Sequence, residues 1–193
     1  MRKAITVATL AALGLTGTAF AADNLSYSYV ELNYLNTELD DLDVEGDGFG
    51  VAGSLAFTPN LHGFASYGTQ DVDDFDGDVD QIELGIGGNW PVSDKLDVIA
   101  TVSYVDLELD GPGNFDLDDN GFALGGALRG RVTDVLELRG GIKYMELDEL
   151  GDDTSLNLGA RYYVTPMFAL GADVSFSDDV TTWVLGARLD FGK

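Results

Sequence analysis

The sequence predicts an all-β protein, an up-and-down antiparallel β-barrel in which ten strands are favoured over eight. Apolar and polar residues alternate with period two in stretches of about ten residues, bounded by turn residues. No window after residue 22 has sustained helical periodicity. The connections between stretches are alternately short and long, as in consecutive hairpins. Closing such a meander into a barrel removes its exposed edges.

Composition sets limits on function. The chain has 193 residues, with 34 acidic and 10 basic side chains and a formal net charge of −24. This length suits one domain. So acidic a chain is a poor partner for nucleic acid, whose phosphates require a basic surface. The absence of cysteine excludes disulfide scaffolds, thiolate zinc sites and cysteine nucleophiles.

Residues 1–21 have the features of a secretory signal peptide. A basic start, Met1–Lys3, precedes the apolar run Ala4–Leu15 and the small-x-small sequence Ala19-Phe20-Ala21. The apolar run is too short for a membrane-spanning helix, which needs about 20 residues. We therefore expect an exported chain whose barrel domain comprises residues 22–193.

The ten expected strands follow in order along the rest of the chain. Their apolar positions are Val30, Leu32, Tyr34; Phe49, Val51, Leu55, Phe57; Leu61, Ala65, Tyr67; Ile82, Leu84, Ile86, Trp90; Val98, Ala100, Val102, Tyr104; Phe122, Leu124, Leu128; Leu136, Leu138, Ile142, Tyr144; Leu158, Ala160, Tyr162; Phe168, Leu170, Ala172, Val174, Phe176; and Trp183, Leu185, Ala187, Leu189, Phe191. The short connections are 58–60, 91–95, 132–134 and 165–166. Long acidic loops are expected at 37–47, 71–80, 106–120 and 146–153, with a brief one at 178–179. These five segments hold 25 of the 34 acidic residues and no lysine or arginine.

The two faces of the strands differ in a way that indicates a membrane barrel. The face opposite the apolar one is rich in glycine and charge, as expected for a narrow polar interior in which glycine leaves room for long side chains. On the apolar face, aromatic residues form two girdles around an aliphatic band, as in transmembrane barrels. The girdle residues are Tyr34, Phe49, Tyr67, Tyr104, Phe122, Tyr144, Phe176 and Trp183 beside the long loops, and Phe57, Trp90, Tyr162, Phe168 and Phe191 beside the short turns. A soluble periplasmic barrel that binds a small apolar ligand is the alternative.

The chain resembles the small bacterial outer-membrane β-barrel family, of the OmpA/OmpX membrane-domain kind, over nearly all of residues 24–191. The ending Gly186-Ala187-Arg188-Leu189-Asp190-Phe191 resembles the family's C-terminal insertion signal, in which Gly186, Leu189 and Phe191 are the matching positions. Val184 and the trailing Gly192-Lys193 depart from that pattern. Tyr27-Ser28-Tyr29-Val30-Glu31 and Phe57-Thr58-Pro59-Asn60 also resemble barrels associated with outer-membrane vesicles. The resemblance implies an outer-membrane location and recognition by the barrel-assembly machinery.

The period-two alternation along the strands also predicts a charge network in the lumen. The inward set comprises Glu31, Glu83, Arg129, Arg131, Glu137, Arg139, Lys143, Arg161, Asp173 and Arg188, with Asp190. Neighbouring strands would pair Arg129 with Glu137 or Arg139, Arg161 with Asp173, and Glu31 with Arg188. Such pairs are expected because an isolated buried charge is costly. The network is either a plug or the lining of a narrow pathway for ions or small solutes.

The acidic segment 71–80 resembles a calcium loop, but Val72 stands at the first ligand position and no helices flank it, so an EF-hand is excluded. Asp74, Asp76, Asp78 and Asp80 remain candidates for low-affinity Ca²⁺ or Mg²⁺ binding, against a simply hydrated acidic rim. No other cofactor is expected.

Nothing in the sequence indicates an enzyme. Catalytic barrels of outer membranes use a histidine at or near the outer side, whereas His62 follows a short turn at the opposite end. Serine-elbow, phosphate-loop and zinc-protease motifs are absent. We expect a structural or surface-interaction role in the cell envelope, through loops that meet divalent cations, lipopolysaccharide or outside partners. A narrow porin-like channel is the alternative.

Overall fold

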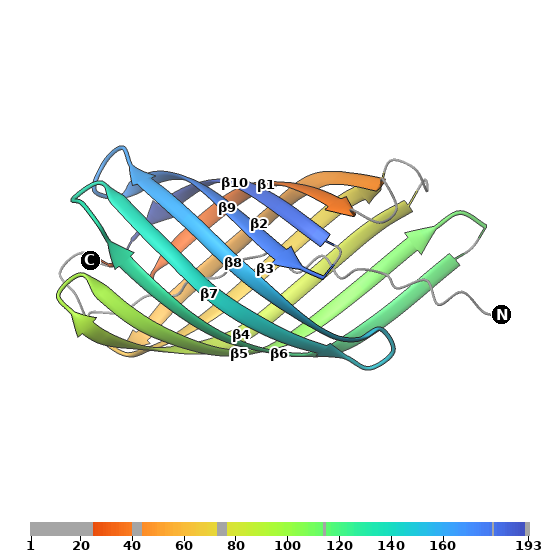
Figure 1. Cartoon of the computed structure of the whole chain (residues 1–193), viewed down its shortest axis with the longest axis horizontal. Coiled ribbons are helices and arrows are strands. Elements are labelled where there is room, and N and C mark those ends of the chain that lie inside the picture. The colour runs from red at the N-terminus through yellow and green to blue at the C-terminus, as the bar shows by residue number, and fades with distance from the viewer. Residues whose placement is uncertain (1–24, 40–43, 73–76, 114, 179, 192–193) are drawn as a thin grey trace.

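The computed structural model describes residues 25–39, 44–72, 77–113, 115–178 and 180–191. Ten strands form one closed barrel, so the predicted fold class and the favoured strand number are confirmed (Figure 1). The strands are β1 (Tyr29–Leu39), β2 (Val44–Thr58), β3 (Leu61–Val72), β4 (Gly77–Ser93), β5 (Leu96–Gly111), β6 (Phe115–Arg131), β7 (Leu136–Leu147), β8 (Gly151–Tyr163), β9 (Phe168–Ser177) and β10 (Val180–Asp190). In the described part of the chain, no helix has the length and apolar character needed to cross a membrane.

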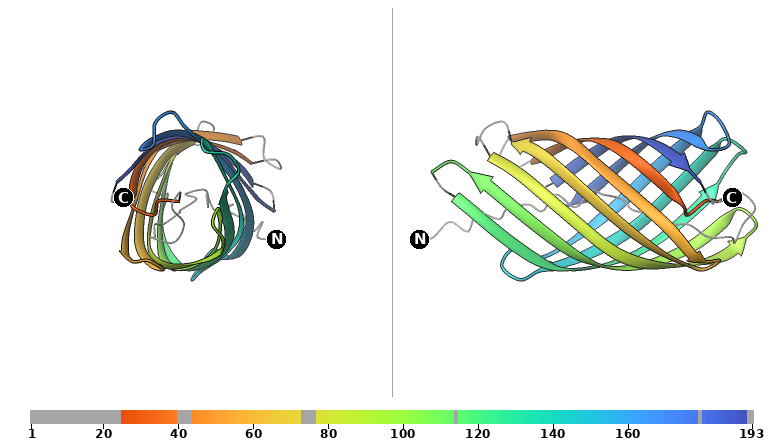
Figure 2. Two further views of the ribbon diagram at one scale, coloured as in Figure 1. Left: turned by 90° about the vertical axis from the view of Figure 1, so that its left-hand side faces the viewer. Right: turned by 180° about the vertical axis from the view of Figure 1, so that it is seen from behind.

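Each strand pairs antiparallel with the next one along the chain, and the barrel closes between β1 and β10. The closing register runs from Tyr29 opposite Asp190 to Leu39 opposite Val180. Figure 2 shows the resulting ring end-on and the tilt of the strands from the side. Closure pairs both edges of the sheet, which otherwise would offer unpaired backbone groups to other chains.

The two ends of the barrel differ. We call the end with the turns at 59–60, 94–95, 132–135 and 164–167 the short-turn end, and the opposite end the long-strand end. The start of the described chain also lies at the short-turn end, because the Phe191 amide donates a 2.8 Å hydrogen bond to the Ser28 carbonyl. At the long-strand end, the green β5–β6 hairpin extends beyond its neighbours (Figure 1).

The alternation along each strand separates an apolar outer face from a polar inner one. Leu32, Ile86 and Leu185 of the aliphatic band are 65, 52 and 59% exposed. The predicted girdle residues also lie on the outside, although Tyr144 is half-buried there. A band of exposed aliphatic side chains between two aromatic girdles matches the lipid-facing surface of a membrane barrel.

The structure corrects the prediction of long acidic loops. Most of these segments are strand: β5 continues to Gly111, β6 begins at Phe115, and residues 112–114 connect them. Beyond the girdle, the polarity of the two faces is reversed. Leu107 and Leu109 point inward and are buried, while Glu108 and Asp110 point outward and are exposed. The reason is that this part of the outer face meets water, so burying its leucines inside the barrel is favourable.

The inner side of this extension has a small apolar core. It consists of Val79, Val105, Leu107, Leu109, Ala123, Met145 and Leu147, with Val72, Leu117 and Leu150 packed against them. The buried carboxylate of Asp119 fixes the β7–β8 turn over this core. It accepts hydrogen bonds from the backbone amides of Glu149, at 3.1 and 3.2 Å, and Leu150, at 2.8 Å. The extension is therefore a packed structure.

The outer side of the extension carries a row of directly opposed carboxylates. Asp47 on β2 lies opposite Asp71 on β3, which lies opposite Asp78 on β4. Asp78 in turn lies opposite Asp110 on β5, which lies opposite Asp116 on β6. We call these five residues the acidic ladder. A hydrogen bond with Asp71 raises the pKa of Asp78 above the ordinary aspartate value, because like charges in direct opposition disfavour ionisation.

Candidate functional site: the charged lumen

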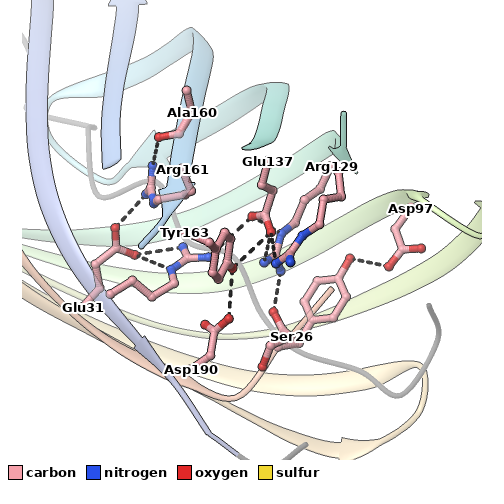
Figure 3. A network of polar contacts seen from close by, with 12 residues as sticks. Ser26, Glu31, Asp97, Arg129, Glu137, Ala160, Arg161, Tyr163 and Asp190 are labelled. Atoms are coloured by element: carbon pink, nitrogen blue, oxygen red, sulfur yellow. Dashed lines mark hydrogen bonds and ion pairs between the residues drawn. The ribbon is translucent and has the colours of Figure 1, made fainter. Parts of the chain in front are cut away.

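All eleven charged residues predicted for the lumen lie on the inner face of the barrel. Eight of them are buried, and Arg139, Lys143 and Asp173 are partly buried. The three predicted pairings occur: Arg129 with Glu137, Arg161 with Asp173, and Glu31 with Arg188. Most of the charges form one continuous group on β1, β6, β7, β8, β9 and β10, part of which Figure 3 shows.

Glu137 on β7 is the first centre of this group. Arg129 donates two hydrogen bonds to it, from Nε to Oε1 at 2.7 Å and from Nη2 to Oε2 at 3.0 Å. Arg131 and Arg188 each approach the same carboxylate to 3.7 Å, and the Tyr163 hydroxyl lies 3.2 Å from Oε2. One carboxylate therefore faces three guanidinium groups. Its pair with Arg129 has the bidentate geometry that makes arginine–carboxylate pairs strong.

Glu31 on β1 is the second centre. Arg188 reaches its Oε2 at 2.9 Å, and Arg161 reaches its Oε1 at 2.7 Å. Arg161 also contacts Asp173 at 2.7 Å. Arg188 thus connects the two centres, and its guanidinium lies 4.1 Å from the ring centroid of Tyr29. The network crosses the seam between β1 and β10, so it also ties the two ends of the barrel sheet together.

A separate ion pair lies nearer the long-strand end. Lys143 contacts Glu83 at 2.6 Å, and Ser103 donates a 2.6 Å hydrogen bond to the other oxygen of the same carboxylate. The pair spans the lumen from β7 to β4. Its side chains are 14 and 4% exposed, so the strands surround it almost completely.

Arg139 is the basic member of the predicted set that the structure leaves without an ion pair among the described residues. Its Nε is buried with no hydrogen-bond partner there. It lines a cavity of about 10 Å³ together with Glu137, Arg161, Asp173 and Arg188. A space of this size holds about one water molecule, which would satisfy the guanidinium.

Glycines on the inner face provide the space for these side chains. A methyl group at Gly159 would overlap the carboxylate of Asp173, and one at Gly171 would overlap the side chain of Arg161. At Gly186 it would meet Glu31 and a neighbouring asparagine. These three positions agree with the prediction that inward glycines make room for long charged residues.

The segment Leu25–Ser28, which precedes β1, is buried inside the barrel, and this placement was not predicted from the sequence. The Tyr27 hydroxyl donates a 2.8 Å hydrogen bond to Asp97, a residue on the polar face that the predicted charge network did not include. Tyr163, which bridges Glu137 and Asp190, was also missed. Tyr27 is in the same alternating register as the inward residues Tyr29 and Glu31. However, no sequence pattern distinguishes a residue inside the lumen from one in the wall of the barrel.

The other candidate residues fall outside the network. Asp74 and Asp76 lie outside the described residues, while Asp78 and Asp80 lie on the outer face of β4. The described residues contain no group of three or more side chains placed to hold a metal ion. Leu189 and Phe191 face outward at the short-turn end.

Comparison with known proteins agrees with this geometry. Residues 7–191 match the model of the outer membrane protein β-barrel domain. The chain belongs to this family. As an outer-membrane barrel, it presents its exposed aliphatic band to lipid, and the two girdles lie at the membrane–water interfaces.

Two solved outer-membrane barrels have similar folds. The NanC porin is 8% identical, with a TM-score of 0.56 over 84% of this chain and all of that one (100%). The KdgM porin is 12% identical, with a TM-score of 0.50 over 84% of this chain and 99% of that one. At these identities the likeness concerns the fold alone. Comparison with curated protein sequences finds no match.

Proposed function

We propose that this outer-membrane protein is a closed barrel with a structural or surface-interaction role in the cell envelope. The observation that carries the proposal is the ion-paired network, in which Arg129 and Glu137 are 0 and 3% exposed inside the lumen near the short-turn end. Small barrels are filled by their own side chains, and fixed pairs leave little space for a solute. The functional surface would then be the outside of the barrel.

In this proposal the long-strand end faces the cell exterior and both chain ends face the periplasm, as in other bacterial barrels with short periplasmic turns. The acidic ladder would then be displayed to the medium. Its chemistry suits cations and cationic partners. Lipopolysaccharide is itself anionic, so contact with it would require bridging by Ca²⁺ or Mg²⁺ at these carboxylates. Delivery by the barrel-assembly machinery and presence in outer-membrane vesicles are further parts of the proposal.

The closed state is tested in planar bilayers. The purified, folded barrel should give no single-channel steps at either polarity, whereas regular steps would refute a closed lumen. Heat-modifiable migration on a detergent gel serves as the control for folding. For the cation role, calorimetry of the folded barrel with millimolar Ca²⁺ or Mg²⁺ should detect binding, and its absence would remove that part.

A narrow channel is the second candidate, favoured by the fold similarity to the NanC and KdgM porins. It requires a continuous hydrated route past the ion pairs. Conductance of the unaltered protein in the same bilayer measurement would favour the channel over the closed barrel.

A further inference from the structure

The described chain begins inside the barrel and not in its wall. Leu25–Ser28 belong to no strand, and their exposed fractions are only 1 to 6%. In the end-on view of Figure 2, the red start of the chain lies within the ring of strands. The segment is therefore a separate element, held by side-chain and backbone contacts with the lumen.

Tyr27 makes the central contacts of this segment. Its ring stacks on His62 of β3, with centroids 5.3 Å apart and planes at 15°. The Arg129 guanidinium of β6 lies 4.7 Å from the same ring centroid, and the hydroxyl donates to Asp97 of β5. Three different strands thus form one pocket around one side chain, and the pocket matches both the aromatic face and the phenolic hydroxyl.

The neighbouring residues extend this attachment. Arg129 Nη1 donates a 2.7 Å hydrogen bond to the Ser26 carbonyl, and Leu25 packs with Tyr27 and Ile99 (Figure 3 shows Ser26, Arg129 and Asp97). The segment consequently covers the wall formed by β3, β5 and β6 at the short-turn end. The charge network is centred on β1, β7, β8 and β10, and Arg129 of β6 belongs to both the network and the pocket around Tyr27. Two elements joined at Arg129 therefore fill the lumen.

Above the segment, towards the long-strand end, the wall of β2–β4 has mostly small or uncharged polar side chains. The exceptions include Phe64, Glu83, which pairs with Lys143, and two valines, Val72 and Val79, at the apolar core of the extension. The other inward residues of this wall include Gly46, Gly48, Gly50, Ala52, Ser66, Gly68, Gln70, Gln81 and Gly85. Ser66 Oγ, Gln70 Oε1 and both amide atoms of Gln81 are buried without a hydrogen-bond partner among the described residues. Buried polar atoms without protein partners are satisfied by water, so this side of the lumen is suited to hydration.

We propose that Leu25–Ser28 closes a hydrated pathway along β2–β4, so that the barrel is a latent channel stoppered by its own N-terminal segment. Small monovalent cations are the solute class that this pathway fits. The acidic ladder concentrates cations at one mouth, and withdrawal of Tyr27 leaves the Asp97 carboxylate without its hydrogen-bond donor at the other. This inference rests on the closed state proposed above.

The test uses Tyr27→Ala in planar bilayers, beside the unaltered protein. Tyr27→Ala should produce single-channel steps that are absent without the substitution, with a reversal potential that favours K⁺ over Cl⁻ in a KCl gradient. Tyr27→Phe keeps the stacked ring and should stay closed. Tyr162→Ala removes the same side chain from the lipid-facing surface near the short-turn end and should also stay silent. Heat-modifiable migration shows that each variant is folded.

A second measurement follows the segment itself. The chain has no cysteine, so Ser26→Cys provides a single thiol for maleimide labelling. Labelling of the folded barrel should be at least tenfold faster when Tyr27→Ala is added, because Ser26 is buried in the seated segment. Rapid labelling without Tyr27→Ala would mean that the segment is not seated, and would overturn the inference.

The outcomes separate this inference from the closed-barrel proposal. Suppose that Tyr27→Ala and the double variant Leu25→Ala/Tyr27→Ala are folded, show rapid maleimide labelling when Ser26→Cys is added, and still give no single-channel steps. The blocking role of Leu25–Ser28 is then refuted, while the closed-barrel proposal stands. If the unaltered protein conducts as strongly as Tyr27→Ala, both are refuted. Currents that favour Cl⁻ would overturn the assignment of cations as the solute.

Discussion

Glu137→Gln tests whether the lumen network stabilises the barrel. The substitution keeps the shape of the side chain and removes its charge. Arg129, which is fully buried, would lose its charged partner at 2.7 and 3.0 Å, and Arg131 and Arg188 would lose the carboxylate at 3.7 Å. Removing one partner of a buried pair costs about 3–5 kcal/mol, because the remaining charge stays desolvated. We expect about 3 kcal/mol, since the glutamine oxygen still accepts one hydrogen bond.

The assay is denaturant unfolding of the barrel folded into lipid vesicles, followed by tryptophan fluorescence. Trp90 and Trp183 are about half exposed on the outer face, so their emission reports departure from lipid. The double variant Arg129→Met/Glu137→Gln should cost less than the sum of the single variants, because methionine removes the charge that glutamine leaves unpaired. A loss below about 1 kcal/mol for Glu137→Gln, or strict additivity in the double variant, would refute the reasoning.

Three further predictions use the same unfolding assay or thermal melting. Gly171→Ala should destabilise the barrel by about 1–3 kcal/mol through overpacking against the buried Arg161 side chain. Gly126→Ala, with open space around it, should be nearly neutral. Equal effects of the two substitutions would contradict the interpretation of the inward glycines. Leu107→Ala should cost about 2–5 kcal/mol as a buried truncation, and a neutral result would mean that the extension has no true core. The melting temperature should rise as the pH falls from 7 towards about 4, because the raised pKa of Asp78 makes the folded barrel bind protons more readily than the unfolded chain. Asp78→Asn/Asp110→Asn should melt higher at pH 7 and show a smaller rise, and an unchanged pH dependence would argue against repulsion in the ladder.

Much of the barrel could be predicted because one face of every strand meets lipid. Period-two alternation fixes which residues share a face, and a charged residue such as Arg188 or Glu31 in the membrane has only the interior available. Adjacent strands in a meander are also adjacent in the sheet, so the pairing of Arg161 with Asp173 follows from sequence order. The closing contact between Glu31 and Arg188 needed only the assumption that the barrel closes.

The length of the strands beyond the girdle was not predicted, because the acidic composition of these segments indicates loops. The alternation in Asp106-Leu107-Glu108-Leu109-Asp110 was present, but with its polarity reversed relative to the membrane part. A search for alternation of either sign would have found it. The segment around Tyr27 is held by contacts with β3, β5 and β6. These strands are far from Tyr27 in the sequence, so the contacts leave no local sequence pattern.

The reversal of polarity at the girdle has a consequence for insertion. Above Tyr104 the outer positions become acidic, so pushing the barrel deeper would bring Asp106 and Glu108 into hydrocarbon. Raising it would expose the aliphatic band below to water. Both displacements are unfavourable, since charged residues on the lipid face are costly and apolar surface in water is disfavoured. The change from aliphatic to acidic residues on the outer face therefore fixes the depth at which the barrel sits in the membrane.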